Sequence, residues 1–174
     1  MDSTEPLLGL ISLTSTMAPA DLLRPLEGQR EETMRVITSM TEEDLETSVR
    51  GDGRSVRQLL CHLIDREHGM NFVISRALAG EVVHLSQEDR DEISRAEADP
   101  APAWDLGRIR RELMEARDTL RQTFHSMSEE DLDRPLRWPE WPARSIRTSI
   151  PYMLEHEDSH LDELRTALPQ LRAS

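Results

Sequence analysis

Apolar residues recur at steps of three and four along most of this 174-residue sequence, a period that predicts amphipathic helices. Four stripes of this kind occupy residues 20–40, 55–79, 106–127 and 145–168. The alternation that is typical of strands is nearly missing, and aromatic residues make up only 3% of the chain. Four long helices with one apolar face each predict an all-α fold, namely a four-helix bundle.

The ends of two helices are marked by capping and helix-breaking residues. Ser55 and Gln58 form a capping-box pattern at the start of the second stripe, and Gly80 stands where a C-terminal cap belongs. Pro169 ends the fourth stripe, and Pro151 inside it predicts a kink. These helix boundaries can therefore be predicted from residues close to them in the sequence.

The sequence also contains an internal repeat. Residues 39–45 (SMTEEDL) return as residues 126–132 (SMSEEDL) at an offset of 87, and residues 54–57 (RSVR) return as 144–147 (RSIR) at an offset of 90. Two helical hairpins related by duplication explain this pattern. The polar, acidic segment 81–103 is then a long central crossover, which predicts an up-down-down-up bundle.

Length and charge limit the possible partners. One domain fits the length, with residues 1–18 as an N-terminal extension and 19–174 as the bundle. The net charge of -13 disfavours nucleic acid and anionic membranes as partners. All 21 basic residues are arginine, which excludes a P-loop and Schiff-base catalysis by lysine. We therefore expect a small-molecule substrate.

Two further features bear on the compartment. The apolar run at residues 7–13 is short and follows acidic residues, which argues against a signal peptide or a membrane span. The single cysteine, Cys61, cannot form an internal disulfide and is expected to be a small buried hydrophobic residue. Both features suggest a cytoplasmic protein.

Three of the six histidines are placed to meet inside such a bundle. His156 and His160 are four residues apart and lean toward the interior, so both imidazoles can grip one metal ion. His62 lies just beyond the apolar stripe of the second helix, which we expect to pack against the fourth. Three converging imidazoles would form a metal site with open coordination positions, whereas the alternative is a set of core histidines held by hydrogen bonds.

These residues resemble a known family. His62-Leu63 followed by Glu67 in the second helix, with His156 and His160-Leu161 in the fourth, is similar to the DinB/YfiT-like superfamily of metal-binding four-helix bundles. The resemblance extends over nearly the whole chain after residue 18 and includes the helix order and the long crossover.

The resemblance has implications for function. It implies a divalent metal, zinc or nickel, on His62, His156 and His160, and kinship with transferases that use a low-molecular-weight thiol. A thiol bound to the cation would become a nucleophilic thiolate that attacks an electrophilic small molecule. Metal-dependent hydrolysis is the alternative activity, and a non-catalytic metal-binding or dimerisation bundle is the alternative class. A bundle of this size is also expected to form a homodimer.

Two glutamates are candidates for a supporting role. Glu67 and Glu157 are equivalent at the 90-residue offset and project from the middle of their apolar stripes. Buried carboxylates need partners, so we expect them to pair with arginines or to support a metal-bound imidazole, with acid/base catalysis as a further possibility. A buried polar pair left from duplication is the alternative without a function.

The remaining candidates are expected to be structural. His68, His84 and His125 are expected on the surface or near loops. The segment 138–142 (WPEWP) fills the longer second interhelical loop and is expected to cover one end of the bundle.

Overall fold

The computed structural model describes residues 17–49, 54–81, 101–136 and 144–168. Four long helices account for most of them. These are α2 (Pro19–Thr38), α3 (Val56–Leu78), α5 (Leu106–Ser126) and α6 (Ile146–Ala167). Their bounds fall within two residues of the four periodic stripes, so the predicted all-α fold is confirmed.

The helix ends follow the local chemistry of the sequence. Ser55 and Gln58 form the expected capping box at the start of α3, and Ser145 and Thr148 form an equivalent one at the start of α6. Gly80 follows the end of α3 with a φ of 75°, a left-handed conformation that glycine adopts without strain.

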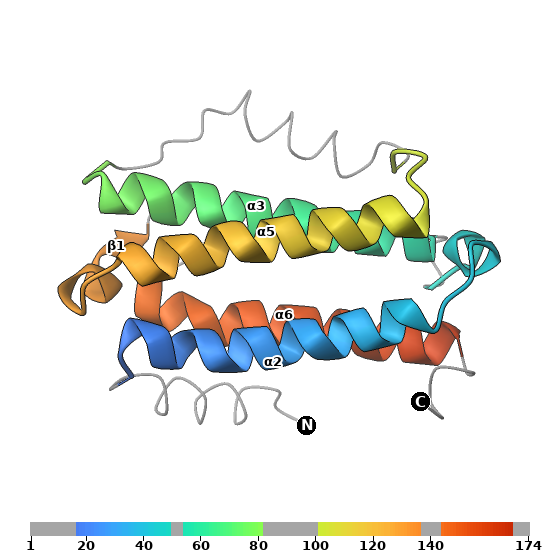
Figure 1. The fold of residues 1–174 in the computed structure, drawn as a ribbon, viewed down its shortest axis with the longest axis horizontal. Coiled ribbons are helices and arrows are strands. Elements are labelled where there is room, and N and C mark those ends of the chain that lie inside the picture. The colour runs from blue at the N-terminus through green and yellow to red at the C-terminus, as the bar shows by residue number, and fades with distance from the viewer. Residues whose placement is uncertain (1–16, 50–53, 82–100, 137–143, 169–174) are drawn as a thin grey trace.

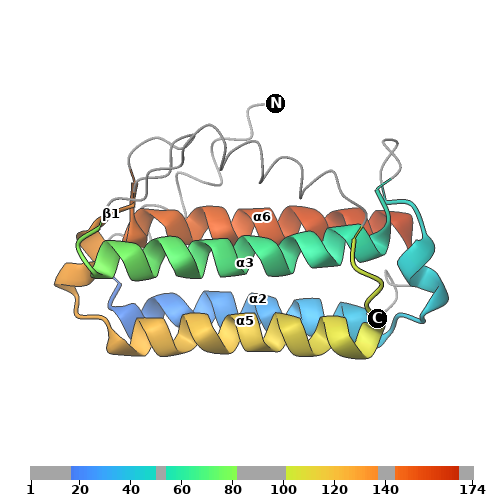
Figure 2. The same ribbon diagram turned by 90° about the horizontal axis from the view of Figure 1, so that it is seen from above.

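The helices run up-down-down-up, as predicted. Figure 1 shows α3 and α5 parallel to each other and both antiparallel to α2 and α6. Helix α3 packs against α5, α5 against α2, α2 against α6, and α6 closes the ring against α3, an arrangement that Figures 1 and 2 show from two sides. The two helices of each repeat are therefore placed diagonally across the bundle, and each helix has both helices of the other repeat as its neighbours.

Short connections cap the bundle at both ends. The repeated SMTEEDL and SMSEEDL segments lead into the 3-10 helices η1 (Glu43–Glu46) and η2 (Glu130–Asp133). Although the sequence gives almost no strand signal, β1 (Pro135–Leu136) pairs antiparallel with β2 (Arg144–Ser145). Such two-residue strands are too short to produce an alternating pattern. Within the described ranges, none of the helices is long and apolar enough to cross a membrane.

The apolar core is divided into two parts along the bundle axis. One part includes Ile37, Leu59 and Leu113, and the other includes Leu22 and Phe124. Most of the buried polar residues lie at or near the boundary between the two parts, and every helix contributes at least one of them. They are Gln29, Arg30, Thr33, Glu67, Asn71, Arg117, Glu157 and His160. A polar layer therefore crosses the middle of the bundle, and the candidate site lies at this level.

Candidate metal centre

The structure brings together the three predicted histidines at the level of the polar layer. His62 lies in the second turn of α3, whereas His156 lies at the middle of α6 and His160 one turn further along it. His160 is buried at 4% exposure, and the other two are half-buried. Helices α3 and α6 are antiparallel neighbours (Figure 2). The imidazoles therefore meet across the interface between these two helices.

The three rings are close enough to share one ion. Nε2 of His62 lies 3.2 Å from Nε2 of His156. The centroid of the His62 ring lies 5.2 Å from the centroid of the His156 ring and 5.2 Å from that of the His160 ring. The centroids of the His156 and His160 rings are 4.5 Å apart. One nitrogen from each ring lies within 4.8 Å of the other two.

This donor set fits a small divalent cation. Zinc–nitrogen bonds of about 2.0–2.1 Å in a tetrahedral site put neighbouring ligand nitrogens about 3.3 Å apart. The separation between His62 and His156 is close to that value. Three neutral nitrogen ligands with further positions open are the pattern of catalytic rather than structural zinc sites.

Glu163 orients one of the imidazoles. Nδ1 of His160 donates a hydrogen bond to a carboxylate oxygen of Glu163, one turn further along α6, at 3.0 Å. With the proton held on Nδ1, the other ring nitrogen is left as an acceptor that can bind a metal. Sequence reasoning missed this residue, although the spacing of three from His160 is a local signal that could have identified it.

The surroundings keep the imidazoles neutral. Burial is the main cause that lowers the pKa of His62 to about 3 and that of His156 to about 4, and charge repulsion from Arg66 and from the neighbouring histidines contributes to both values. A metal binds imidazole only in its neutral form, so this environment leaves the ligands available without competition from protons near neutral pH. Arg66 therefore lies close to the site, which the sequence did not indicate.

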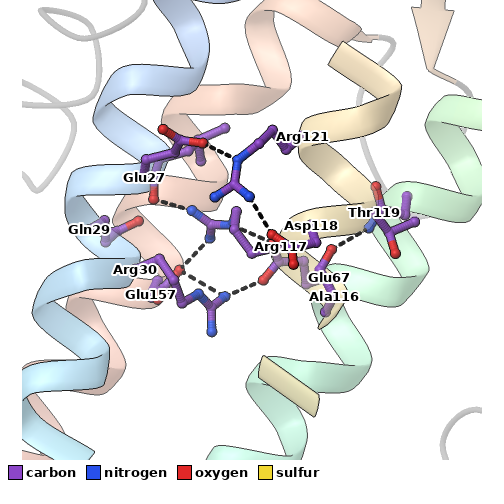
Figure 3. Close-up of polar contacts among 12 residues, drawn as sticks. Glu27, Gln29, Arg30, Glu67, Ala116, Arg117, Asp118, Thr119, Arg121 and Glu157 are labelled. Atoms are coloured by element: carbon purple, nitrogen blue, oxygen red, sulfur yellow. Dashed lines mark hydrogen bonds and ion pairs between the residues drawn. The ribbon is translucent and has the colours of Figure 1, made fainter. Parts of the chain in front are cut away.

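Glu67 and Glu157 are both buried, each at 5% exposure, and both pair with arginines. Arg117 donates through Nε to Glu67 at 2.5 Å and through Nη2 to Glu157 at 3.0 Å. Arg30 donates through Nη2 to Glu67 and, at 3.5 Å, to Glu157. Figure 3 shows these four side chains as a closed group in the bundle interior. Thr33 adds a hydrogen bond to Glu157.

This buried charge quartet takes one residue from each helix. Arg30 on α2 and Arg117 on α5 are related by the 87-residue offset, just as Glu67 on α3 and Glu157 on α6 are related by the 90-residue offset. The quartet therefore consists of two pairs of residues that are equivalent in the internal repeat. The sequence pattern pointed to the glutamates, but the two arginines were missed, although the same repeat offset would have found them.

The other candidates lie outside the site. His68 and His125 are exposed, and Nδ1 of His125 donates a hydrogen bond to the Arg121 carbonyl oxygen in the last turn of α5. Cys61 is buried at 5% exposure, and burial raises the pKa of its thiol to about 11. His84 and the segment 138–142 lie outside the described residues.

Comparison with known proteins places the chain in a family. The model of the DinB superfamily matches residues 25–164. The uncharacterised protein YuaE of Bacillus subtilis (strain 168) is 24% identical over 146 residues, which cover 78% of this chain and 90% of YuaE.

The fold is also similar to a solved structure. YfiT from Bacillus subtilis, described as a probable metal-dependent hydrolase with an unusual four-helix bundle topology, superposes with a TM-score of 0.60 at 17% identity. The match covers 87% of this chain and 90% of YfiT. The family model matches four-fifths of the chain, and the diagonal placement of consecutive helices and the histidine cluster agree with that match. The chain therefore belongs to the DinB superfamily.

Proposed function

We propose that this protein is a divalent-metal-dependent enzyme whose ion is held by His62, His156 and His160. The observation that carries the proposal is the convergence of three imidazole nitrogens within 4.8 Å of one another, two of them on rings whose pKa is lowered well below 6.5. Zinc or nickel suits such nitrogen ligands. Three ligands leave room for a substrate atom on the ion.

We expect the nucleophile to be a molecule bound at the ion rather than a lysine or cysteine of the chain. The sequence has no lysine, and Cys61 is buried with a raised pKa, so neither residue type supplies a ready nucleophile. A divalent cation in this site would lower the pKa of a coordinated thiol or water and so supply a nucleophile near neutral pH. The chain's own part is to fix the three imidazoles, and Glu163 holds the proton on Nδ1 of His160.

Transfer of a low-molecular-weight thiol to an electrophilic small molecule is the activity that we favour. The resemblance to thiol-dependent members of the superfamily supports it. A cavity of about 490 Å³ beside His156 supports it as well, because that volume suits a small co-substrate.

Hydrolysis is the second candidate. The likeness of the fold to YfiT, described as a probable metal-dependent hydrolase, favours it. The same three imidazoles and the same cavity serve either reaction, so the two candidates differ in the nucleophile that occupies the site.

Metal content tests the site directly. Wild-type protein purified without an affinity tag is expected to carry about one equivalent of zinc or nickel by mass spectrometry of the elements, and His62→Ala, His156→Ala and His160→Ala are expected to lose it. His68→Ala is the matched control, because His68 is exposed on the same helix as His62. A wild-type protein that takes up neither metal would refute the proposal.

A thermal-shift panel then separates the two activities. If the enzyme uses a thiol, one of bacillithiol, mycothiol, glutathione or coenzyme A raises the melting temperature of the metal-loaded protein and leaves His160→Ala unchanged. Loaded protein that responds to none of the four favours hydrolysis. A protein that binds metal and turns over neither class of substrate is a non-catalytic bundle.

A further inference from the structure

The cavity beside the histidine cluster is lined mainly by residues of α3 and α6. Its walls include Leu63 and Met70 on α3, and Tyr152, Met153 and His156 on α6. The two residues of α3 are buried, whereas the three residues of α6 are half-buried. A small molecule in this cavity would therefore lie against one of the predicted metal ligands and against apolar side chains of both helices.

The internal duplication relates this cavity to the metal site. At the offset of 90 between α3 and α6, the counterparts of the three clustered histidines, in the order 62, 156 and 160, are Tyr152, Arg66 and Met70. All three counterparts line the cavity. A guanidinium stays protonated in proteins, so Arg66 cannot take the place of an imidazole ligand. Of two equivalent positions in the bundle, one therefore carries the predicted ion ligands and the other lines a space that can hold an organic molecule.

Apolar side chains from both halves of the duplication form part of the wall. Leu63 on α3 and Met153 on α6 are equivalent at the 90-residue offset, and both line the cavity. Met70 and the ring of Tyr152 extend this apolar surface on the two helices. Methionine is unbranched and flexible, and its thioether packs favourably against aromatic rings. The apolar wall can therefore adapt to hydrocarbon groups of different shapes.

The buried charges of the lining are balanced. They belong to the buried charge quartet, whose two arginines and two glutamates pair with one another at the inner wall. Arg66 and Glu155 are exposed and so belong to the mouth of the cavity. The half-buried Arg144 has its guanidinium carbon 3.1 Å from the centre of the Tyr152 ring.

This distribution of charge and apolar surface favours one kind of ligand. A charged group in the inner part of the cavity would lose its hydration beside charges that are already paired, which is unfavourable. A hydrocarbon group in the same place gains free energy by leaving water. Burial of apolar surface is therefore the main source of affinity that the inner part of the cavity offers.

We propose that this cavity binds the hydrocarbon part of a hydrophobic small molecule, between Met70 on α3 and Tyr152 and Met153 on α6. Its volume of about 490 Å³ lies in the range of small-molecule sites. Because His156 lines the same cavity, the bound molecule lies beside the predicted ion. That this molecule is the substrate attacked at the ion rests on the proposed function; that the cavity binds hydrophobic molecules does not.

The single tyrosine of the chain allows a direct test. Labelling with 3-fluorotyrosine places one fluorine nucleus in the chain, at Tyr152 in the wall of the cavity, and its NMR signal reports binding there. The probes are 1-butanol, 1-pentanol and 1-hexanol, each titrated into zinc-loaded and metal-free protein of measured metal content. Met153→Gln makes the wall polar at similar size, and Met153→Leu keeps it apolar. Met114→Gln is the matched control, because Met114 is an exposed methionine on α5 that does not line the cavity.

The wild-type signal is expected to shift saturably, with affinity rising about fourfold for each added methylene group. Met153→Gln is expected to weaken 1-hexanol about three- to tenfold, whereas Met153→Leu and Met114→Gln bind it like wild-type protein. No saturable shift, or an affinity that ignores chain length, would overturn the proposal. Equal weakening by Met153→Gln and Met114→Gln would overturn it as well. The chain-length series on wild-type protein decides the question even if Met153→Gln does not fold.

The same titrations separate this inference from the proposed function. Chain-length-dependent binding of the alcohols to protein that takes up neither zinc nor nickel would support the hydrophobic cavity and refute the metal-dependent reaction. Zinc-loaded protein whose Tyr152 signal responds to none of the alcohols would refute the hydrophobic cavity and leave the metal site in place.

Discussion

His62 on α3 and His156 on α6 face each other with their Nε2 atoms 3.2 Å apart, although 94 residues separate them in the chain. Two neutral imidazoles at this distance can share one proton or one cation. A cation bound as proposed would contact the ring of His160 as well, whereas a shared proton would join only two of the three rings. This relationship between the two halves of the duplicated chain is the basis for the first prediction.

Zinc is expected to stabilise the folded protein. A ligand that binds only the native state adds RT ln(1 + [L]/Kd), which is about 2.7 kcal/mol at a hundredfold excess over Kd. Thermal unfolding of metal-stripped wild-type protein is expected to shift upward on addition of zinc. His62→Ala is expected to lose this shift, and the exposed His68→Ala is expected to keep it.

Removal of Glu163 is expected to weaken metal binding without removing a ligand. Its hydrogen bond holds the proton of His160 on Nδ1, and loss of such a supporting carboxylate typically costs about ten- to a hundredfold in metal affinity. Competition with a chromophoric chelator measures the affinity of Glu163→Ala for zinc. Asp158→Ala, an exposed acidic residue of the same helix, is the control. Equal affinities for the two variants would contradict the assigned role.

The metal-free protein is expected to lose stability as the pH falls below 6.5. The folded-state pKa values of His62 and His156 are lowered to about 3 and about 4. Just below pH 6.5 these histidines therefore bind protons in the unfolded chain but not in the folded chain. The free energy of unfolding therefore rises with pH in this window, and the effect is complete above 6.5. Urea unfolding between pH 5 and 7 measures the slope. His156→Ala should flatten it, and the exposed His68→Ala should not.

The buried charge quartet is expected to act as one unit. Glu67→Gln leaves Arg30 and Arg117 with too little negative charge around them, which is expected to cost about 3–5 kcal/mol of unfolding free energy. Arg117→Met is expected to be similarly destabilising. The double variant is expected to lose clearly less than the sum of the two, because it removes a whole ion pair. Additive losses in urea unfolding would show that the pair is not coupled.

Cys61 is expected to resist alkylation in the folded protein. Its thiol has a pKa of about 11, so at pH 8 roughly a thousandth of it is thiolate. Mass spectrometry after treatment with iodoacetamide is expected to show slow modification of native protein and rapid modification in urea. Fast modification of native protein would contradict the conclusion that Cys61 is buried and unreactive, and would make Cys61 a candidate nucleophile.

The sequence by itself determined the helices and part of the site. Helix bounds could be predicted because the apolar period and the capping boxes act within a few residues of each other, as at Ser55 and Gln58. The pairing of His156 with His160 is local in the same sense, since one helical turn separates them. The inward position of Glu67 and Glu157 followed from their place on the apolar stripes.

The sequence led us to expect the second helix beside the fourth, but only the tertiary structure decided how all four faces meet. The diagonal packing of consecutive helices, which places α3 beside α6, brings His62 to His156 and closes Arg30 and Arg117 around the two glutamates. Periodicity shows that a side chain points inward, but the rotation of each helix about its axis and its choice of neighbour depend on the packing of all four helices at once. For that reason the cavity with Arg66 in its wall was not visible in the sequence.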